Sequence, residues 1–249
     1  MNELLGKLEI DDAFGQEVWD HFKGERHFEI VERDDGFIDA GSFGGLVYFA
    51  KFDDWENIDK EAIKYAKGKT LDIGCGAGRH ALYLQNKKFD VTGIDNSPLA
   101  IKVCKERGLE KAFVLPIVEV ETLLPEKFDS ILLLGHNFGL FGSFQEARSL
   151  LAKIGNVTNP GAIIISTTRD PYQSTEAVHE EYQQKNLAEG RMGGQLRLRI
   201  RHKKLIGSWF NYLFVSKEEL KHIVEGSGWK VKEFIGNEEP EYGVILEKE

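Results

Sequence analysis

Residues 70–80 constrain the fold of this chain more than any other stretch. Their sequence, TLDIGCGAGRH, places three glycines at alternate positions directly after an apolar run that ends in an acidic residue. The run predicts a buried strand, the glycines predict a tight turn with positive φ angles, and the following residues predict a helix. Because a helix N-terminus offers unpaired amides, this order of elements indicates a nucleotide-cofactor loop.

The composition excludes several classes of protein. A formal net charge of −9 over 249 residues argues against general affinity for nucleic acid or anionic membranes. The two cysteines, Cys75 and Cys104, lack the spacing of a metal site or a disulfide framework, so we expect no metal and a reducing, cytoplasmic location. No stretch approaches the roughly 20 apolar residues of a membrane span, and residues 1–6 do not resemble a signal peptide.

Strand and helix patterns alternate from the glycine loop to residue 168, which predicts a parallel sheet with helical crossovers. After the strand that enters the loop, we expect strands at residues 89–95, 112–115, 128–134, 162–166, 229–235 and 242–246. We expect helices at residues 11–22, 61–67, 81–84, 99–107, 142–154 and 216–224. Ser97 and Ser216 are expected N-caps, the latter in an S-x-x-E capping box. Residues 159–161 and 237–240 predict turns, and the second turn favours an antiparallel hairpin.

Two regions lie outside this alternation. Residues 37–55 are rich in aromatic residues and glycine, which predicts an irregular lid or entrance in which Tyr48 contacts a ligand. Residues 170–205 are long and polar where a crossover helix is due, which indicates an insertion. Within it, Leu196, Leu198 and Ile200 alternate with Arg197, Arg199 and Arg201, so we expect a strand with one basic face and a hairpin partner at residues 209–215.

Four motifs taken together resemble the class I S-adenosylmethionine-dependent methyltransferases. They are LDIGCGAG at residues 71–78, VTGIDNS at 91–97, FDSI at 128–131 and the NPG turn at 159–161. The resemblance implies a doubly wound α/β fold with a mostly parallel seven-stranded sheet and an antiparallel last strand. An N-terminal helical lid and a β-hairpin insertion after strand five would complete it. We expect one domain over residues 1–249, made of a cap (1–66), a cofactor core (67–168), a substrate-lid insertion (169–215) and a closing segment (216–249).

The same resemblance implies an S-adenosylmethionine site, with S-adenosylhomocysteine as the product. Gly74, Gly76 and Gly78 would let the backbone approach the methionine and ribose part of the cofactor. Asp72 would orient the loop and the cofactor amino group. Asp95 would accept hydrogen bonds from both ribose hydroxyls, as the two oxygens of a carboxylate can.

Further residues are expected around the adenine and the methionine ends of this cofactor. Asn96 would flank the adenine, and Ile117 and Val118 would contact its ring. Glu119 is the one acidic residue available after the third strand, where the family often has an acidic contact. Gly135 and His136 follow the fourth strand, from which family members approach both the methionine moiety and the substrate.

The reaction inferred from the resemblance is methyl transfer to a small-molecule acceptor, with His136 as the first candidate base and His202 as the second. An alternative is an RNA or protein methyltransferase that uses the basic hairpin at residues 191–204, although a solvated outer face also explains this basic run. A non-catalytic cofactor-binding module is a third class. The GxGxG spacing and the antiparallel ending argue against a nicotinamide-dependent dehydrogenase. The absence of NPPY, DPPY and Pro-Cys sequences after the fourth strand argues against base methylation.

Overall fold

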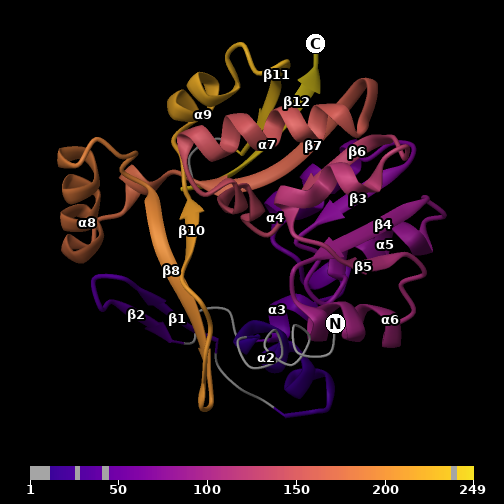
Figure 1. Cartoon of the computed structure of the whole chain (residues 1–249), viewed down its shortest axis with the longest axis horizontal. Helices are drawn as coiled ribbons and strands as arrows, with labels where there is room; N and C mark the ends of the chain where they lie inside the picture. Colours follow the sequence, from indigo (N-terminus) through magenta and orange to yellow (C-terminus); the bar gives the residue numbers. More distant parts are fainter. Residues whose placement is uncertain (1–11, 26–28, 41–44, 237–239) are drawn as a thin grey trace.

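Two β-sheets organise the protein, and a cleft lies between them (Figure 1). The computed structural model describes residues 12–25, 29–40, 45–236 and 240–249. Strands β1 and β2 come from the N-terminal segment, whereas the strands that pair with them come from the insertion between residues 170 and 215. No helix within these described ranges is long and apolar enough to cross a membrane.

The larger sheet has seven strands in the order β11-β12-β7-β6-β3-β4-β5. Strands β3 to β7 pair in parallel, and β12 runs antiparallel to both of its neighbours, which confirms the predicted sheet. Every residue of β3 and β4 is buried, as expected of parallel strands covered on both faces. The strand bounds are β3 Thr70–Ile73, β4 Val91–Asp95, β5 Ala112–Val114, β6 Phe128–Leu133, β7 Thr158–Arg169, β11 Trp229–Ile235 and β12 Glu241–Lys248.

Helices cover both faces of this sheet. Buried residues of α4 (Asn57–Ala62), α5 (Arg79–Asn86) and α6 (Pro98–Glu106) form one apolar cluster, and those of α7 (Phe144–Asn156) and α9 (Lys217–Val224) form the other. The predicted caps are confirmed, because Ser97 Oγ accepts from the Ala100 amide at 3.0 Å and Ser216 forms a capping box with Glu219. Short 3₁₀ turns complete the connections: Phe52–Asp54, Ile63–Tyr65, Ile117–Leu123, Asn137–Phe141 and Pro171–Gln173.

Strand β7 is longer and less regular than predicted. The expected turn at residues 159–161 lies inside the strand, because Thr158 pairs with Phe128 whereas Ile163 already pairs with Ser130. The extra residues form a bulge, which Gly161 permits with a φ of 69°. At its other end β7 continues to Arg169 because β12 pairs with residues 163–169, and this extension brings Arg169 to the cavity.

The smaller sheet confirms the predicted hairpin and corrects the expected lid. Strand β8 (Gln195–His202) pairs with β10 (Phe210–Leu213) and with the short β9 (Leu205–Ile206). The other edge of β8 pairs with β1 (Ile30–Arg33), which in turn pairs with β2 (Ile38–Ala40). The sequence does not predict β1 and β2, because these strands have only four and three residues and β1 joins the sheet through β8, more than 150 positions further along the chain.

The expectation of an irregular region at residues 37–55 is therefore correct only in part. It contains β2, the single-turn helix α3 (Leu46–Phe49) and a 3₁₀ turn, while the glycine-rich residues 41–44 lie outside the described ranges. The predicted turn at residues 237–239 also lies outside them, although the antiparallel pairing of β11 with β12 is confirmed.

The insertion contains a helix that the sequence does not predict, α8 (Ala177–Ala188). It has no apolar stripe, and polar side chains attach it to the smaller sheet instead. The Tyr182 hydroxyl donates to Asp34 Oδ1 at 2.6 Å, and Asn186 Nδ2 donates to the carbonyls of Gly193 and Gln195. Because hydrophobic periodicity is the main sequence signal for a helix, a helix held by polar contacts leaves no such signal.

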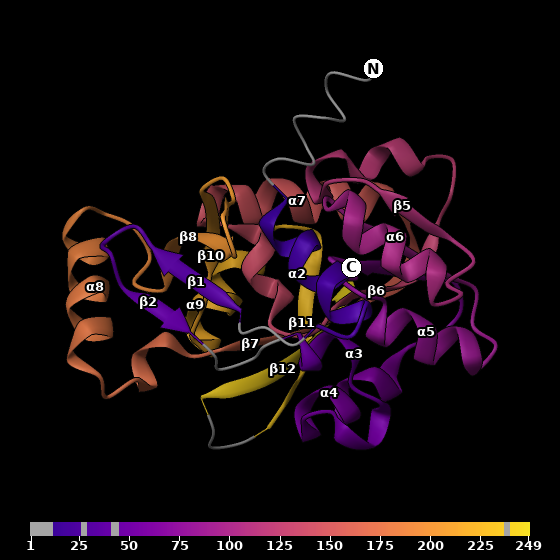
Figure 2. The same cartoon turned by 90° about the horizontal axis from the view of Figure 1, so that it is seen from below.

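Helix α2 (Ala13–Phe22) joins the two sheets, and its prediction from residues 11–22 is confirmed. It lies between the smaller sheet and α6, as Figure 2 shows from below. Asp12 caps α2 by accepting from the Gly15 amide, and its second oxygen accepts from Ser97 Oγ at 2.8 Å. One carboxylate therefore fixes the start of α2 against the start of α6.

Candidate functional site

A cavity of about 1330 Å³ lies between the carboxyl ends of the parallel strands and the smaller sheet. This volume exceeds the 300–1,000 Å³ of most ligand pockets, so the cavity has room for two small molecules side by side. The glycine loop forms one wall, and the apolar face of β8 (Leu196, Leu198 and Ile200) forms part of the opposite wall. The period of two in the sequence thus correctly separates the cavity face of β8 from its basic face.

The glycine loop approaches its neighbours too closely for side chains. Gly74, Gly76 and Gly78 have φ angles of 69°, 53° and 82°. A Cβ atom on Gly74 would lie 2.7 Å from Asn137 Nδ2, and one on Gly78 would lie 3.1 Å from Cys104 Sγ. Asn137 in turn donates to the carbonyls of Ile73 and Gly74, which fastens the loop to the turn that follows β6. The loop is therefore held in one shape by backbone contacts.

Asp95 ends β4 beside this loop and is 7% exposed. Its Oδ2 accepts from the Gly76 amide and its Oδ1 from the Ser97 amide, both at 2.9 Å. Burial raises its pKa to about 6, although these amides favour the ionised form. Each carboxylate oxygen keeps further acceptor capacity, and Asp95 lines the cavity. The side chain is thus equipped to accept hydrogen bonds from two neighbouring hydroxyls of a ligand.

Asp72 lies beneath the loop rather than in the cavity wall. It is 2% exposed, and its Oδ2 has no hydrogen-bond partner. Burial raises its pKa to about 7, while the Ala81 amide and the charge of Arg79 oppose this rise. A buried oxygen without a partner is the exception in folded proteins, so a bound donor is the simplest explanation for it.

Most of the other predicted contacts lie in the cavity wall, and two do not. The wall contains Tyr48, Asn96, Ile117, Val118, Gly135 and His136. Glu119 is exposed and lies outside the wall, and Gly78 lies behind it at the N-cap of α5. Near the adenine position expected from the sequence, the structure therefore offers the 3₁₀ turn with Ile117 and Val118 but no acidic side chain from this turn.

The two candidate bases lie in different places. His136 has a φ of 65°, and its ring lies edge-on to Phe214 with the ring centres 6.3 Å apart. Burial lowers the pKa of His136, while the charge of Asp59 opposes this shift. His202 is 2% exposed, outside the cavity wall, and its Nε2 lies 2.8 Å from Asp20 Oδ2. The second candidate base is therefore wrong, because His202 cannot reach a ligand in this cavity.

A polar cluster around Asp59 supports the same edge of the sheet, and the sequence gives no warning of it. Asp59 accepts from Arg79 Nη2 at 2.9 Å, and its other oxygen accepts from Thr167 Oγ1 at 3.3 Å. Burial opposes ionisation of Asp59, but the neighbouring His80 and Arg79 hold its pKa at about 2. Arg79 follows the glycine loop directly and lines the cavity. Its place one residue after the last glycine is the only sequence signal that could have identified it.

Two tyrosines connect distant parts of the cavity wall. The Tyr48 hydroxyl donates to Glu29 Oε1 at 2.8 Å, and the Tyr212 hydroxyl donates to the His136 carbonyl at 2.7 Å. Nothing in the sequence marks Glu29, because the strand that follows it, β1, is not predicted from the sequence. Tyr212 lies in the predicted hairpin partner, so its position in that strand was the available signal.

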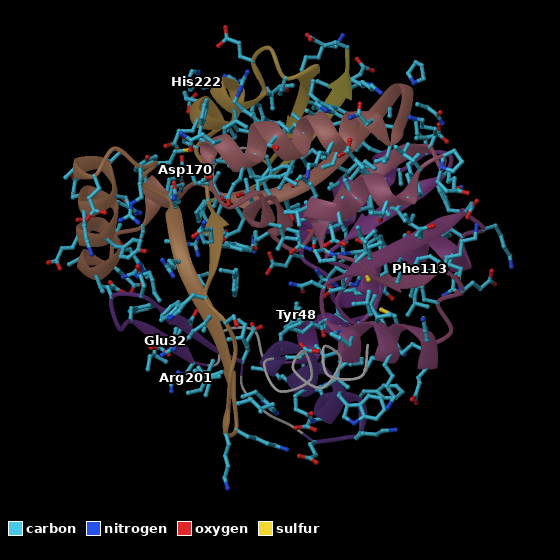
Figure 3. The ribbon with its side chains drawn as sticks, in the orientation of Figure 1. Glu32, Tyr48, Phe113, Asp170, Arg201 and His222 are labelled. Atoms are coloured by element: carbon cyan, nitrogen blue, oxygen red, sulfur yellow. The ribbon has the colours of Figure 1, made fainter. Side chains whose placement is uncertain are left out.

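The basic run on β8 is largely neutralised by acidic neighbours. Arg199 and Arg201 both bind Glu32 of β1, and Lys203 pairs with Asp20 and Glu25 at 2.7 Å. Figure 3 labels Glu32 and Arg201 on the smaller sheet, away from the seven-stranded core, with Tyr48 nearer the middle of the molecule. The hairpin therefore presents an ion-paired outer face. In the described part of the chain, no three histidine, cysteine or acidic side chains are grouped so that they could hold a metal ion.

Comparisons with known proteins agree with this geometry. Residues 64–228 match the family model described as a methyltransferase domain. The chain is 26% identical to a glycine/sarcosine N-methyltransferase from Halorhodospira halochloris, over 55% of this chain and 53% of that protein. It is 28% identical to rat glycine N-methyltransferase, over 41% and 40% of the two chains. This chain thus spans about half the length of the curated relatives it matches.

Solved structures share the fold over a longer stretch. An S-adenosylmethionine-dependent methyltransferase from Bacteroides fragilis, crystallised with S-adenosylhomocysteine, superposes with a TM-score of 0.79 at 24% identity. The match covers 95% of this chain and 94% of that one. A methyltransferase from Methanosarcina mazei superposes with a TM-score of 0.59 at 19% identity, over 78% of this chain. At these identities the similarity concerns the fold.

Proposed function

The chain belongs to the class I S-adenosylmethionine-dependent methyltransferases, whose cofactor is S-adenosylmethionine, and we propose that it methylates a small molecule bound in the cleft. The observation that supports a small acceptor is the large cavity, which adjoins the glycine loop and continues between the two sheets. Two glycine/sarcosine N-methyltransferases among the relatives make nitrogen the first acceptor atom to test.

The cofactor half of the cavity consists, in this proposal, of the glycine loop, Asp95 and the turn after β5. Asp95 accepts from the two ribose hydroxyls with the oxygens that the Gly76 and Ser97 amides hold in place. Ile117 and Val118 provide an apolar surface for the adenine. Asp72 supports the loop from beneath, and its unpartnered oxygen accepts a hydrogen bond from a water molecule that bridges it to the cofactor amino group.

The acceptor half consists of the remaining wall. When bound, the cofactor would supply an electrophilic methyl group on a sulfonium, to whose carbon an acceptor lone pair can bond while the sulfide leaves with the carbon–sulfur electron pair. The protein therefore has to align two ligands and, for some acceptors, remove a proton. His136 is our candidate base, because burial favours its neutral form and its ring lines the cavity. We propose that the chain acts as one domain, since the smaller sheet combines strands from residues 1–66 and 169–215.

Calorimetric titration with S-adenosylhomocysteine tests the first part of this proposal. We expect one saturable site per chain, and the absence of binding would contradict it. The second part is tested by transfer of a labelled methyl group from S-adenosylmethionine into a small-molecule extract and, separately, into total RNA. We expect label in the small molecules alone, because the basic hairpin is ion-paired. Binding without transfer to either pool would instead support a non-catalytic module.

A further inference from the structure

Two carboxylates from separate segments lie behind one part of the cavity wall. Glu17 of α2 is 1% exposed, and neither of its oxygens has a hydrogen-bond partner in the described part of the chain, although the nearby Gly45 amide acts to lower its pKa. Glu29 lines the cavity just before β1, and its Oε1 accepts from the Tyr48 hydroxyl at 2.8 Å. A buried carboxylate without a partner is costly, so this arrangement calls for a reason beyond folding.

Within the described ranges, no basic side chain pairs with either carboxylate. Burial, and then the charge of Glu29, raises the pKa of Glu17 to about 8; burial also raises the pKa of Glu29, to which Asp39 adds a further negative charge. Three other acids differ: Asp59 has Arg79, Asp20 has Lys203, and Glu32 has two arginines. Among the described residues, Glu17 and Glu29 therefore lack the basic partner that these three acids have.

The acidic pair lies beside the expected position of the cofactor. A Cβ atom on Gly76 would lie 3.4 Å from the Tyr48 ring, so Tyr48 covers the middle of the glycine loop. Phe14 contacts Tyr48 edge to face, with the ring centres 5.2 Å apart. Burial, and then the charge of Glu29, raises the pKa of Tyr212 on β10, and both residues line the cavity. An acceptor bound between these elements would meet the Glu29 carboxylate.

We propose that Glu29 binds the positively charged amine of the methyl acceptor, with Tyr48 orienting the carboxylate and Glu17 adding negative charge behind it. The substrate class is thus a small primary or secondary amine. This inference rests on the proposed function, since it concerns the acceptor half of the same cavity.

The arrangement also provides for the proton that such an acceptor must lose. An ammonium group has no lone pair, so it cannot attack the methyl carbon. Its N–H donates to the free oxygen of Glu29 and the proton then passes to this carboxylate, which leaves a neutral amine and a neutral carboxylic acid. The amine lone pair forms the new bond to carbon, the product leaves as the methylated ammonium ion, and the Glu29 carboxylic acid then returns its proton to water. A hydroxyl acceptor would gain little here, because a carboxylate is too weak a base to ionise an alcohol.

An amine-selective block tests the substrate class and does not require the acceptor to be identified first. A small-molecule extract is divided, and one half is treated with N-hydroxysuccinimidyl acetate, which converts primary and secondary amines to amides. We expect labelled methyl transfer into the untreated half and a loss of at least about 90% of the label in the treated half, because an amide nitrogen has no ammonium form for Glu29 to bind. Equal transfer into both halves would overturn the amine subsite, whereas no transfer into either half would contradict the proposed function itself.

Glu29→Gln tests the residue. We expect the initial rate with dilute extract to fall about 10- to 100-fold, the loss associated with a hydrogen bond to a charged group, while S-adenosylhomocysteine affinity stays within threefold. The matched control is Glu32→Gln. Glu32 binds Arg199 on the face of β1 that points away from the cavity, so the initial rate and the S-adenosylhomocysteine affinity should both stay within twofold. An unchanged rate in Glu29→Gln would overturn the assignment. If Glu29→Gln does not fold, Tyr48→Phe replaces it: a severalfold lower rate at unchanged cofactor affinity supports the proposal, and an unchanged rate overturns it.

Discussion

The two ends of the cavity are built in opposite ways. At the cofactor end, the loop and Asp95 come from one short stretch of chain, and backbone amides and carbonyls make most of the contacts. At the acceptor end, side chains converge from segments far apart in sequence, among them Glu29, His136 and Tyr212. One end therefore depends on local backbone geometry, and the other depends on long-range pairing of strands.

In our proposal, this difference separates binding of the methyl donor from selection of the acceptor. The glycine loop keeps its shape because glycines fit where a side chain would collide, so we expect binding of the methyl donor to depend little on the insertion. The smaller sheet can vary its side chains without disturbing that loop, as expected when specificity is carried by inserted segments on a constant scaffold. Variants at the two ends should consequently affect different measurements.

Asp95→Ala should give the largest effect and confine it to the cofactor end. The change removes a carboxylate that has two amide donors and, in our proposal, two ribose hydroxyls. Since a hydrogen bond to a charged group contributes about 1.5–3 kcal/mol, S-adenosylhomocysteine affinity should fall at least ~100-fold. Calorimetry measures this loss, with circular dichroism as the control for folding. Unchanged affinity would contradict the ribose role.

Glu17→Gln, a change behind the acceptor end, should stabilise the folded protein in a pH-dependent way. The pKa of Glu17 in the folded chain is about 8, above the ordinary 4.5, so the unfolded chain releases this proton at lower pH. The cost of burying the carboxylate is absent below pH 4.5 and grows until pH 8. The free energy of unfolding of the variant, relative to the wild-type chain, should rise over this range by at most about 5 kcal/mol.

Urea denaturation of both proteins at pH 4.5 and pH 8 measures that difference. Because all other titrating groups are shared, the comparison isolates Glu17. If the free energy of unfolding of the variant does not rise relative to the wild-type chain at pH 8, the Glu17 carboxylate has a counter-charge in solution and does not add negative charge behind Glu29.

Asn137→Ala should affect the cofactor end moderately. Its amide donates to the carbonyls of Ile73 and Gly74, so the variant loses the tie between the loop and the turn after β6. Two neutral hydrogen bonds contribute about 1 kcal/mol each, and we expect cofactor affinity to fall about tenfold. A change in acceptor KM or kcat without a change in cofactor affinity would show instead that the two ends are coupled.

Arg199→Gln should have the smallest effect on either end. The side chain lies on the basic face of β8 and binds Glu32, away from the cavity wall. Cofactor affinity and the rate of acceptor methylation should both stay within twofold of the unchanged chain. Salt-dependent RNA binding that disappears in this variant would revive the RNA alternative.

The predictions from sequence succeed where the determinants are local. The buried runs of β3, β4 and β6, the caps at Ser97 and Ser216 and the alternation in β8 each depend on neighbouring residues. They fail where the partner is distant. Helix α8 is held by polar contacts rather than by an apolar stripe, and one edge of β1 pairs with the distant strand β8.

The candidate site divides in the same way. Asp95 and the glycines can be identified because their spacing along the chain is set by one strand, turn and helix. Glu29 and Tyr48 have no such spacing, and their hydrogen bond joins residues that the sequence does not mark as neighbours. His202 shows the converse, since it is only the second candidate base in the sequence because it lies in a charged hairpin turn, and packing buries it against Asp20.

The sequence by itself determined the nucleotide-type loop, the parallel sheet and the acidic residue that ends the second strand. These depend on steric freedom at glycine and on apolar periodicity, which are properties of short stretches of chain. Only the tertiary structure decided what faces this loop. The smaller sheet is assembled from both sides of the core, and it brings Glu29 to the cavity, where no basic side chain of the described residues pairs with it, because burial and charge are set by neighbours in space.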